Sequence, residues 1–347
     1  MRFYQRQHQF YCGIDLHART MCVCVVDHAG KVLVNDDGPC EPERFLRLIE
    51  PYRADLVVAC ECTFHWYWVA DLCDQQKIKF VLGHALYMKA IHGGKKKNDQ
   101  IDAHKIALLL KGGMLPQAYA YPRGMRETRD LLRRRTYLVR RRAELLTHIE
   151  NTNSQYNLPP FGKKLSYKAN RSGVAERFSD ECVRQSIAID LELVEHYDRL
   201  ITELELYLVR HAKVDDAYRF HLLRSVPGIG KVLALVLLYE MHRVERFESA
   251  GEFLSYARLV AGRGSSAGKP KGVMGRKIGN AHLKWAFSEA ICFFIRECPE
   301  AKRFVARQEK KHGKARARAI LAARLGRAVF LMLKRKEPFD VQRFFAS

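Results

Sequence analysis

Four carboxylates are placed where they could bind a metal ion together: Asp15, Glu61, Asp99 and Asp102. Asp15 ends one apolar, strand-like run and Glu61 ends a second. Asp99 and Asp102 are three residues apart at the start of an apolar-periodic segment, where a helix would put them on one face. Mg²⁺ prefers carboxylate oxygens, and two ions about 4 Å apart can hold the attacking and leaving oxygens of a phosphodiester displacement.

The first part of the chain, residues 1–122, has the pattern of an α/β domain. Its apolar runs predict strands at 10–16, 20–26, 31–35, 55–61 and 78–82. Helical patterns occur at 41–52, 65–76 and 99–111. Three hairpin-linked strands followed by alternating helices and strands is the order of an RNase H-like (RuvC-like) domain. In that fold, acids lie at the ends of the first and fourth strands and on the last helix, which is where these four carboxylates fall.

Each acid taken alone has an ordinary explanation. Asp99 and Asp102 would favour the positive end of a helix dipole, and Asp15 and Glu61 could be surface acids at strand ends. Because all four fall at matching places of one fold order, we favour a metal site with Mg²⁺, or with Mn²⁺ in its place.

The charge of the chain indicates a polyanionic partner. Lys and Arg number 60 against 38 Asp and Glu, which gives a formal net charge of +22. No apolar run approaches the roughly 18 residues that a membrane span needs, and the N-terminus lacks the apolar stretch of a signal peptide. We therefore expect a cytoplasmic protein that acts on nucleic acid and not on a membrane.

The ten cysteines do not have the spacing of a zinc site. Cys22/Cys24 and Cys60/Cys62 are C-x-C pairs inside strand-like runs, and no C-x-x-C pair occurs in the sequence. We expect reduced and mostly buried thiols in a reducing compartment.

A basic helix is predicted to begin near residue 123. Between Arg123 and Arg142 nine arginines face only two acids, and leucine or valine pairs recur every seven residues. Such a surface would bind nucleic acid through its phosphates, with strong salt dependence. The residues assigned to this role are Arg126, Arg129, Arg133, Arg134, Arg140 and Arg141.

A second long helix is expected at about 186–212, after a connection at about 158–182. Leu193, Tyr197, Leu200, Leu204 and Tyr207 alternate four and three apart, which is coiled-coil spacing. The two helices would form an antiparallel hairpin or pair with those of another protomer. We therefore predict an arm at 123–215 and a mostly helical C-terminal domain at 216–347.

Two segments of the C-terminal domain could contact phosphate. Pro227-Gly228-Ile229-Gly230-Lys231 resembles the hairpin of helix-hairpin-helix DNA-binding motifs, although a tight turn between helices without a ligand explains it equally well. Ser265 and Ser266 lie in a Gly-rich stretch before a helix predicted at 281–297. The cations around them are Arg263, Lys269, Lys271, Arg276 and Lys277.

A serine hydroxyl is a weak nucleophile unless a base, a metal or cations activate it. The cations of this stretch could hold a phosphate and stabilise the transition state of its displacement. From composition alone, we favour a flexible loop whose serines only hydrogen-bond to phosphate.

The sequence resembles a known family, the DEDD insertion-sequence transposases of the IS110/IS1111 group, which are related to the Piv-type DNA invertase. The motifs that carry the resemblance cover nearly the whole chain. They are Gly13-Ile14-Asp15, Cys60-Glu61-Cys62-Thr63, Asn98-Asp99-Gln100-Ile101-Asp102-Ala103, Pro227-Gly228-Ile229-Gly230, and Ser265-Ser266-Ala267-Gly268 continuing through Lys277-Ile278-Gly279-Asn280 to Leu283-Lys284.

The resemblance implies a recombinase guided by a noncoding RNA (a bridge RNA or seek RNA) that the element encodes. By position, the four acids are Asp15, Glu61, Asp99 and Asp102, and the nucleophile is Ser266, with Ser265 as the adjacent alternative. The family implies a covalent phosphoserine intermediate and strand exchange between donor and target DNA. It further implies dimers that assemble into a tetramer, in a prokaryotic cytoplasm at the nucleoid.

Two other classes of function remain open from the sequence. A RuvC-like nuclease or junction resolvase would hydrolyse DNA with the acids alone and would form no protein–DNA adduct. An architectural protein with vestigial acids would bind nucleic acid and catalyse nothing.

Overall fold

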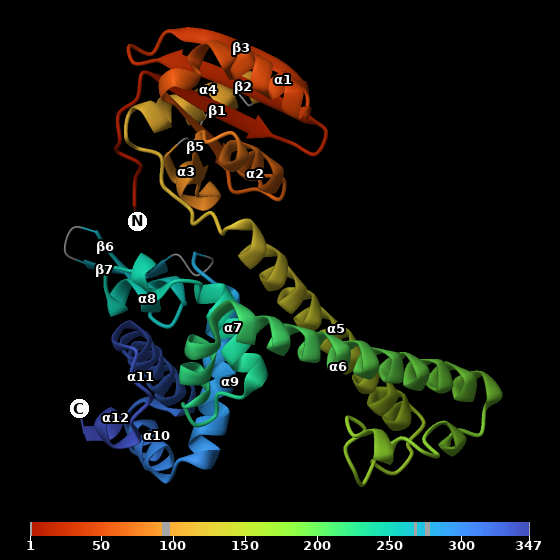
Figure 1. Cartoon of the computed structure of the whole chain (residues 1–347). Helices are drawn as coiled ribbons and strands as arrows, with labels where there is room; N and C mark the ends of the chain where they lie inside the picture. Colours follow the sequence, from red (N-terminus) through yellow and green to blue (C-terminus); the bar gives the residue numbers. More distant parts are fainter. Residues whose placement is uncertain (1, 92–97, 267–268, 275–277, 347) are drawn as a thin grey trace. The chain divides into compact units, whose positions relative to one another are not determined.

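The computed structural model describes residues 2–91, 98–266, 269–274 and 278–346 (Figure 1). The chain divides into two compact units, Met1–Arg123 and Gly124–Ser347. The first is an α/β domain and the second is largely helical.

A five-stranded sheet forms the centre of the N-terminal unit, with the strand order β3-β2-β1-β4-β5. β1 pairs antiparallel with β2 and parallel with β4, and β4 pairs parallel with β5. The strand bounds are β1 Phe10–Leu16, β2 Thr20–Asp27, β3 Val32–Pro39, β4 Leu56–Glu61 and β5 Lys79–Gly83. The five predicted strands are thus confirmed, although β3 extends further than the predicted 31–35.

Helices cover both faces of this sheet. One face packs against α1 (Pro42–Ile49) and α2 (Tyr67–Gln75), and the other against α3 (Ala85–Ile91) and α4 (Asp99–Lys111). Because side chains alternate along a strand, Ile14 and Cys60 face the first pair of helices, whereas Tyr11 and Ala59 face α4. Strands buried on both faces explain why their sequences are continuous apolar runs.

The predicted helix at 41–52 ends earlier than expected. Regular α-helix stops at Ile49 and continues as a 3₁₀ turn, Glu50–Asp55. Pro51 lies within this turn and has no N–H with which to continue the α-helical hydrogen bonds. The predicted helix at 99–111 is confirmed by α4, whereas α3 was not predicted.

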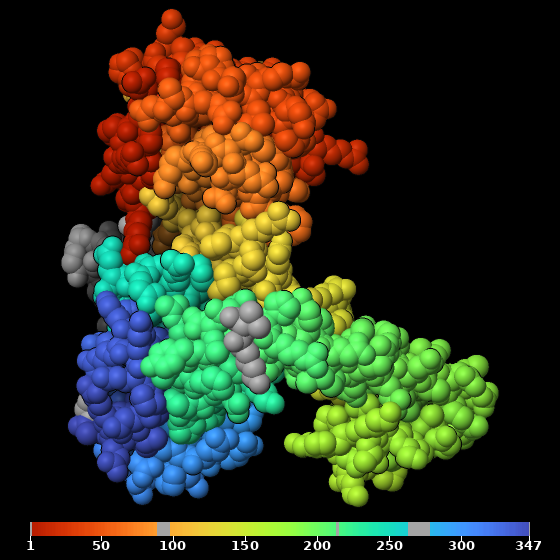
Figure 2. Space-filling model, viewed as in Figure 1, coloured from red at the N-terminus to blue at the C-terminus, as the bar shows by residue number. Residues whose placement is uncertain are grey.

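Two long helices, α5 (Arg123–Gln155) and α6 (Glu181–Arg224), run side by side in the second unit (Figure 1). Ion pairs join Arg135 with Glu205, Arg142 with Asp198 and His148 with Asp190. Since partners on α6 are met in descending order as α5 ascends, the two helices are antiparallel. The connection between them packs Leu165, Val174 and Phe178 against Ile149 and Ile187. This connection lies at one end of the helix pair (Figure 2).

The buried seam of α6 differs from the predicted one. Leu193 and Tyr207 are exposed at 39% and 49%, so they are not seam residues. The fully or nearly buried positions are seven residues apart: Ile187, Val194, Ile201 and Leu208. Both series have coiled-coil spacing. The series from Ile187 to Leu208 is the buried one, whereas Leu193 and Tyr207 of the predicted series lie on the exposed side of α6.

Asp216 has non-helical backbone angles and marks a kink in α6; the described residues after α6 form six further α-helices and a β-hairpin. Within this unit, nearly all of α7 (Lys231–Met241) is buried. The others are α8 (Ala250–Tyr256), α9 (Ala281–Glu297), α10 (Pro299–His312), α11 (Lys314–Arg335) and α12 (Val341–Ala346). α9 confirms the helix predicted at 281–297. No helix among the described residues is both long and apolar enough to cross a membrane.

The described residues of the serine-containing stretch form two strands. β6 (Gly262–Ser266) and β7 (Lys269–Met274) pair antiparallel, with Ser265 opposite Pro270 and Ser266 opposite Lys269. The prediction of a loop was therefore wrong for Gly262–Ser266 and Lys269–Met274. Glycine weakens strand propensity, so the pairing of the two segments was not visible in local composition.

Candidate active site

Asp15 and Glu61 lie on neighbouring parallel strands. Ile14 is in register with Cys60, so the next residue on each strand brings Asp15 beside Glu61 at the carboxyl ends of β1 and β4. In-register residues of paired strands point to the same face, which here is the face covered by α4. The side chain of Asp15 is 15% exposed, and Glu61 is half-buried.

The absence of a side chain at Gly13 allows α4 to lie directly on β1. A Cβ at this position would be 2.3 Å from the Ala103 carbonyl oxygen and 2.4 Å from the Ala107 nitrogen, both backbone atoms of α4. Asn98 caps the helix by accepting a hydrogen bond from the Gln100 N–H, and Asp99 follows as the first helical residue. This close approach brings the start of α4 to the end of β1, where Asp15 lies.

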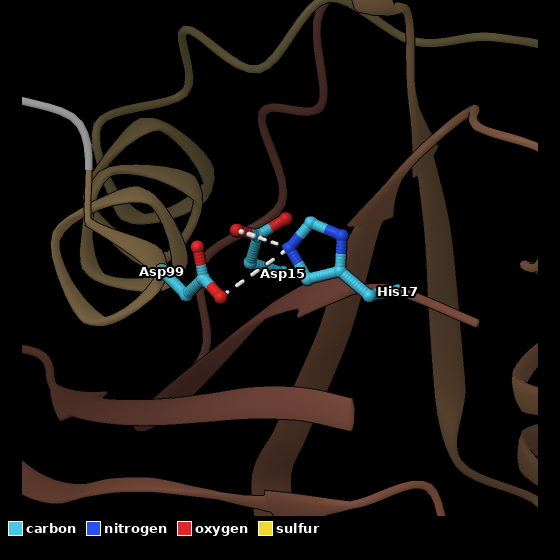
Figure 3. Close-up of side chains that lie close together, drawn as sticks. All are labelled: Asp15, His17 and Asp99. Atoms are coloured by element: carbon cyan, nitrogen blue, oxygen red, sulfur yellow. Dashed lines mark ion pairs between the residues drawn. The ribbon is translucent and has the colours of Figure 1, made fainter. Parts of the chain in front are cut away.

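A histidine lies between two of the predicted acids (Figure 3). The Nε2 atom of His17 is 3.5 Å from an Asp15 carboxylate oxygen and 3.5 Å from an Asp99 carboxylate oxygen. One ligand atom from each of the three residues can be chosen so that all lie within 4.8 Å of one another. Sequence reasoning missed His17, although its place two residues after Asp15 would have put both on one side of an extended chain.

The other two predicted acids do not belong to this group of three. Asp102 accepts a hydrogen bond from the Lys105 ammonium group at 2.9 Å, three residues along α4. Glu61 lies at the sheet edge next to Asp15 but outside the group. In the described residues, the structure therefore brings Asp15 and Asp99 together, with Asp102 one turn further along α4 and Glu61 at the end of β4, the strand next to β1.

A buried polar network holds the chain just after the β6–β7 hairpin. Asn280 caps α9 by accepting hydrogen bonds from the N–H groups of His282 and Leu283, and its amide donates to Glu240 at 2.8 Å. Glu240 is 1% exposed and receives two hydrogen bonds from Arg133 on α5, at 2.7 and 2.9 Å. Burial alone would raise the pKa of Glu240, but the bonds from Arg133 and Asn280 outweigh burial and lower it.

The Pro227–Gly230 segment forms a tight turn between α6 and α7. Gly228 has a φ of +83°, and a Cβ there would lie 2.5 Å from the Phe294 nitrogen of α9. Its N–H donates to Glu297 at 3.0 Å. The turn therefore packs onto α9, and Lys231 is exposed as the first residue of α7.

Comparison with known proteins assigns the family. A model for the DEDD transposase of IS110 matches residues 12–157, which include all four predicted acids. A model described as the transposase IS116/IS110/IS902 family matches residues 220–306, which include the turn and the β6–β7 hairpin. The chain belongs to the IS110 family of transposases. This transposase is also 22% identical, over 94% of its length and 90% of the relative's, to the transposase for insertion sequence element IS1111A of Coxiella burnetii.

A DEDD transposase domain suggests a divalent metal, and the residues present fit one. Two carboxylate oxygens and an imidazole nitrogen are all established ligands of divalent ions, and they converge within 4.8 Å. Cys22 lies opposite Asp15 in the sheet, but burial raises the pKa of its thiol to about 12. The Cys22 thiol is buried in the core between the sheet and α4 and donates a hydrogen bond to Asn35 at 3.6 Å.

The cysteines are free, and six of the ten are buried, as predicted. The predicted serine chemistry lies largely outside the described residues. The described backbone places Ser265, Ser266 and Arg263 on β6 and Lys269 and Lys271 on β7, but their side chains are not described. Arg276 and Lys277 lie wholly outside the described residues.

The arginines of α5 divide into buried and exposed ones. Arg126 and Arg129 are only 3% and 6% exposed, and Arg133 is bound to Glu240. Arg134, Arg140 and Arg141 are exposed. Arg134 and Arg141 lie over the ring of exposed Tyr137, at 4.9 and 5.0 Å from its centroid.

Proposed function

We propose that this transposase is an RNA-guided DNA recombinase whose N-terminal unit is an RNase H-like metal domain. The convergence of Asp15 and Asp99 at the end of the central strand carries this proposal. The strand order and directions of the sheet support the RNase H-like assignment. The net charge of +22 supports polyanionic partners, here donor DNA, target DNA and the guide RNA.

In the proposed reaction Ser266 is the nucleophile. Its hydroxyl loses its proton, the Oγ–phosphorus bond forms, and a strand phosphorus–oxygen bond breaks, so that the leaving deoxyribose oxygen takes up a proton. The resulting phosphoserine ester retains the bond energy needed for religation to the exchanged strand, so no ATP is required. The described backbone of β6 and β7, with Ser266 in register with Lys269, supports a serine held close to basic residues of the opposite strand.

In this proposal the four acids of the N-terminal unit hold a metal ion that assists the serine. A divalent ion, Mg²⁺ or Mn²⁺, bound there would neutralise phosphate charge and favour ionisation of the attacking oxygen. Asp15 and Asp99 would hold it, with Glu61 and Asp102 as nearby ligands or as hydrogen-bond partners of bound water. We propose that these acids act on the serine of another protomer, in a tetramer assembled from dimers through the coiled-coil arms.

The exposed basic residues would hold the nucleic acids. On α5 we assign this role to the exposed Arg134, Arg140 and Arg141 and not to their buried or half-buried neighbours. Arg141 also forms an ion pair with exposed Glu144. Tyr137, flanked by two guanidinium groups, offers an aromatic face on which a base could stack. Lys231, Lys269 and Lys271 are the corresponding cations proposed for the C-terminal unit.

The test is a denaturing gel of full-length protein with the element-derived RNA, Mg²⁺ and labelled donor and target DNA. The proposal predicts a covalent protein–DNA band in wild type that is absent from Ser266→Ala and Asp15→Ala. Ser265→Ala tests the adjacent serine, and Ser255→Ala, an exposed serine on α8, should leave the band unchanged. Free cleaved ends without an adduct, insensitive to both serine changes, would instead identify a metal-dependent nuclease.

A further inference from the structure

We propose that His17 is a direct ligand of the metal ion that Asp15 and Asp99 hold, and that its nitrogen makes this site prefer Mn²⁺ over Mg²⁺. The proposal rests on the metal centre of the proposed function. It goes further because it adds a ligand outside the four acids and predicts which class of ion the site selects.

The distances around His17 fit a shared ion. Two ligand atoms roughly 2.2 Å from an ion, at an angle of about 105°, are ~3.5 Å apart. The Nε2 atom of His17 is 3.5 Å from an oxygen of Asp15 and 3.5 Å from an oxygen of Asp99. An ion could therefore lie between the three ligand atoms without movement of β1 or α4.

The turn after β1 holds the histidine in place. The His17 N–H donates to the Thr20 carbonyl at 2.9 Å, and the Cys40 thiol donates to the His17 carbonyl at 3.5 Å. Asp15, two residues earlier, is hydrogen-bonded into the sheet between β2 and β4. Backbone hydrogen bonds thus fix the main-chain positions of Asp15 and His17. The close approach of α4 at Gly13 fixes the position of Asp99.

The ligand set explains the expected preference. Mg²⁺ demands near-ideal octahedral geometry, with ligand atoms at right angles about 3.0 Å apart, and it binds oxygen and water in preference to nitrogen. First-row transition ions accept imidazole readily, and Mn²⁺ also accepts carboxylates. A site with two carboxylates and one imidazole, with spacings of 3.5 Å, suits Mn²⁺ better than Mg²⁺.

The experiment measures metal binding by full-length protein in the absence of DNA and RNA. Electron paramagnetic resonance of free Mn²⁺ gives the affinity, with Mg²⁺ as competitor, and pulsed spectra report nitrogen coordinated to Mn²⁺. The variants are His17→Ala, Asp15→Asn and a control, His28→Ala. His28 is an exposed histidine in the turn between β2 and β3.

We expect wild type and His28→Ala to bind Mn²⁺ with a ¹⁴N coupling. In His17→Ala the coupling should disappear, and Mn²⁺ affinity should fall at least tenfold, since even loss of an outer-shell partner costs roughly 10- to 100-fold. Mg²⁺ affinity should change less, so the preference for Mn²⁺ should shrink.

Two results would overturn the proposal and are distinguishable. Binding that Asp15→Asn abolishes, but that shows no ¹⁴N coupling or is unchanged in His17→Ala, would remove His17 as a ligand and leave the metal centre intact. Binding that does not depend on Asp15 would remove the metal centre itself, and with it the metal step of the proposed function.

Discussion

Gly13→Ala should damage the candidate metal centre without altering any of its ligands. The new Cβ would lie 2.3 Å from the Ala103 carbonyl oxygen and 2.4 Å from the Ala107 nitrogen. An ordinary contact between such atoms is ~3.4 Å, so α4 must move away from β1 by about 1 Å. Because the obstructing atoms are helix backbone, no side-chain rotation can relieve the clash.

The size of the effect follows from this displacement. Overpacking of a well-packed core costs about 1 to 3 kcal/mol, and a clash with backbone belongs at the upper end. For a unit of this length, about 3 kcal/mol lowers the Tm by roughly 10 °C. Asp99 is the first residue of α4 and moves with it, so the Asp15–Asp99 spacing opens and Mn²⁺ binding weakens.

Differential scanning calorimetry of the full chain, followed by Mn²⁺ titration, measures both consequences. Gly124→Ala is the matched control, since a Cβ there would meet no atom within 4 Å and the residue lies inside α5. An unfolding temperature and Mn²⁺ affinity equal to wild type in Gly13→Ala would refute the close packing of α4 on β1 and the argument that this packing positions Asp99.

Three further predictions concern the C-terminal unit. Arg133→Ala leaves Glu240 buried without its main partner and should cost about 3 to 5 kcal/mol in urea unfolding, and Arg133→Ala with Glu240→Gln should cost less than the two single changes combined. Burial and the nearby Arg243 lower the pKa of His242 to about 4, whereas the unfolded value is about 6.5. In this pH range the unfolded state therefore binds a proton that the folded state does not, and the free energy of unfolding should fall as pH drops from about 6.5 to 4. His242→Asn should flatten this pH dependence. The control His312→Asn, at an exposed histidine, should retain it. Arg134→Ala and Arg140→Ala should each reduce the slope of log affinity against log salt for nucleic acid by about 1, whereas Arg199→Ala, which removes a charge already ion-paired with Glu203, should not.

The sheet domain could be predicted because its signals are local. Strands buried on both faces produce short apolar runs. The start of α4 is indicated by the capping residue Asn98 and by two acids in the first turn, Asp99 and Asp102. The positions of Asp15 and Asp99 at element ends followed from the same patterns. Their meeting depends on the contact of Gly13 with α4, which is a long-range property that no local pattern contains.

The unpredicted features are those that depend on partners distant in sequence. Pairing between β6 and β7 overrides the low strand propensity of their glycines. The seam of α6 is selected by what α5 offers, so the series through Val194 and Ile201 is buried and Leu193 is not. His17 carries no signal beyond its spacing from Asp15 until α4 brings Asp99 to its other side.

The central claim is that Asp15 and Asp99 form the metal centre of this transposase. The most direct measurement is anomalous diffraction at the manganese edge from crystals of the full-length protein grown with Mn²⁺. We predict one anomalous peak within about 2.3 Å of carboxylate oxygens of both Asp15 and Asp99. Ordered Asp15 and Asp99 side chains with no peak between them, or Mn²⁺ bound only by other residues, would contradict the account.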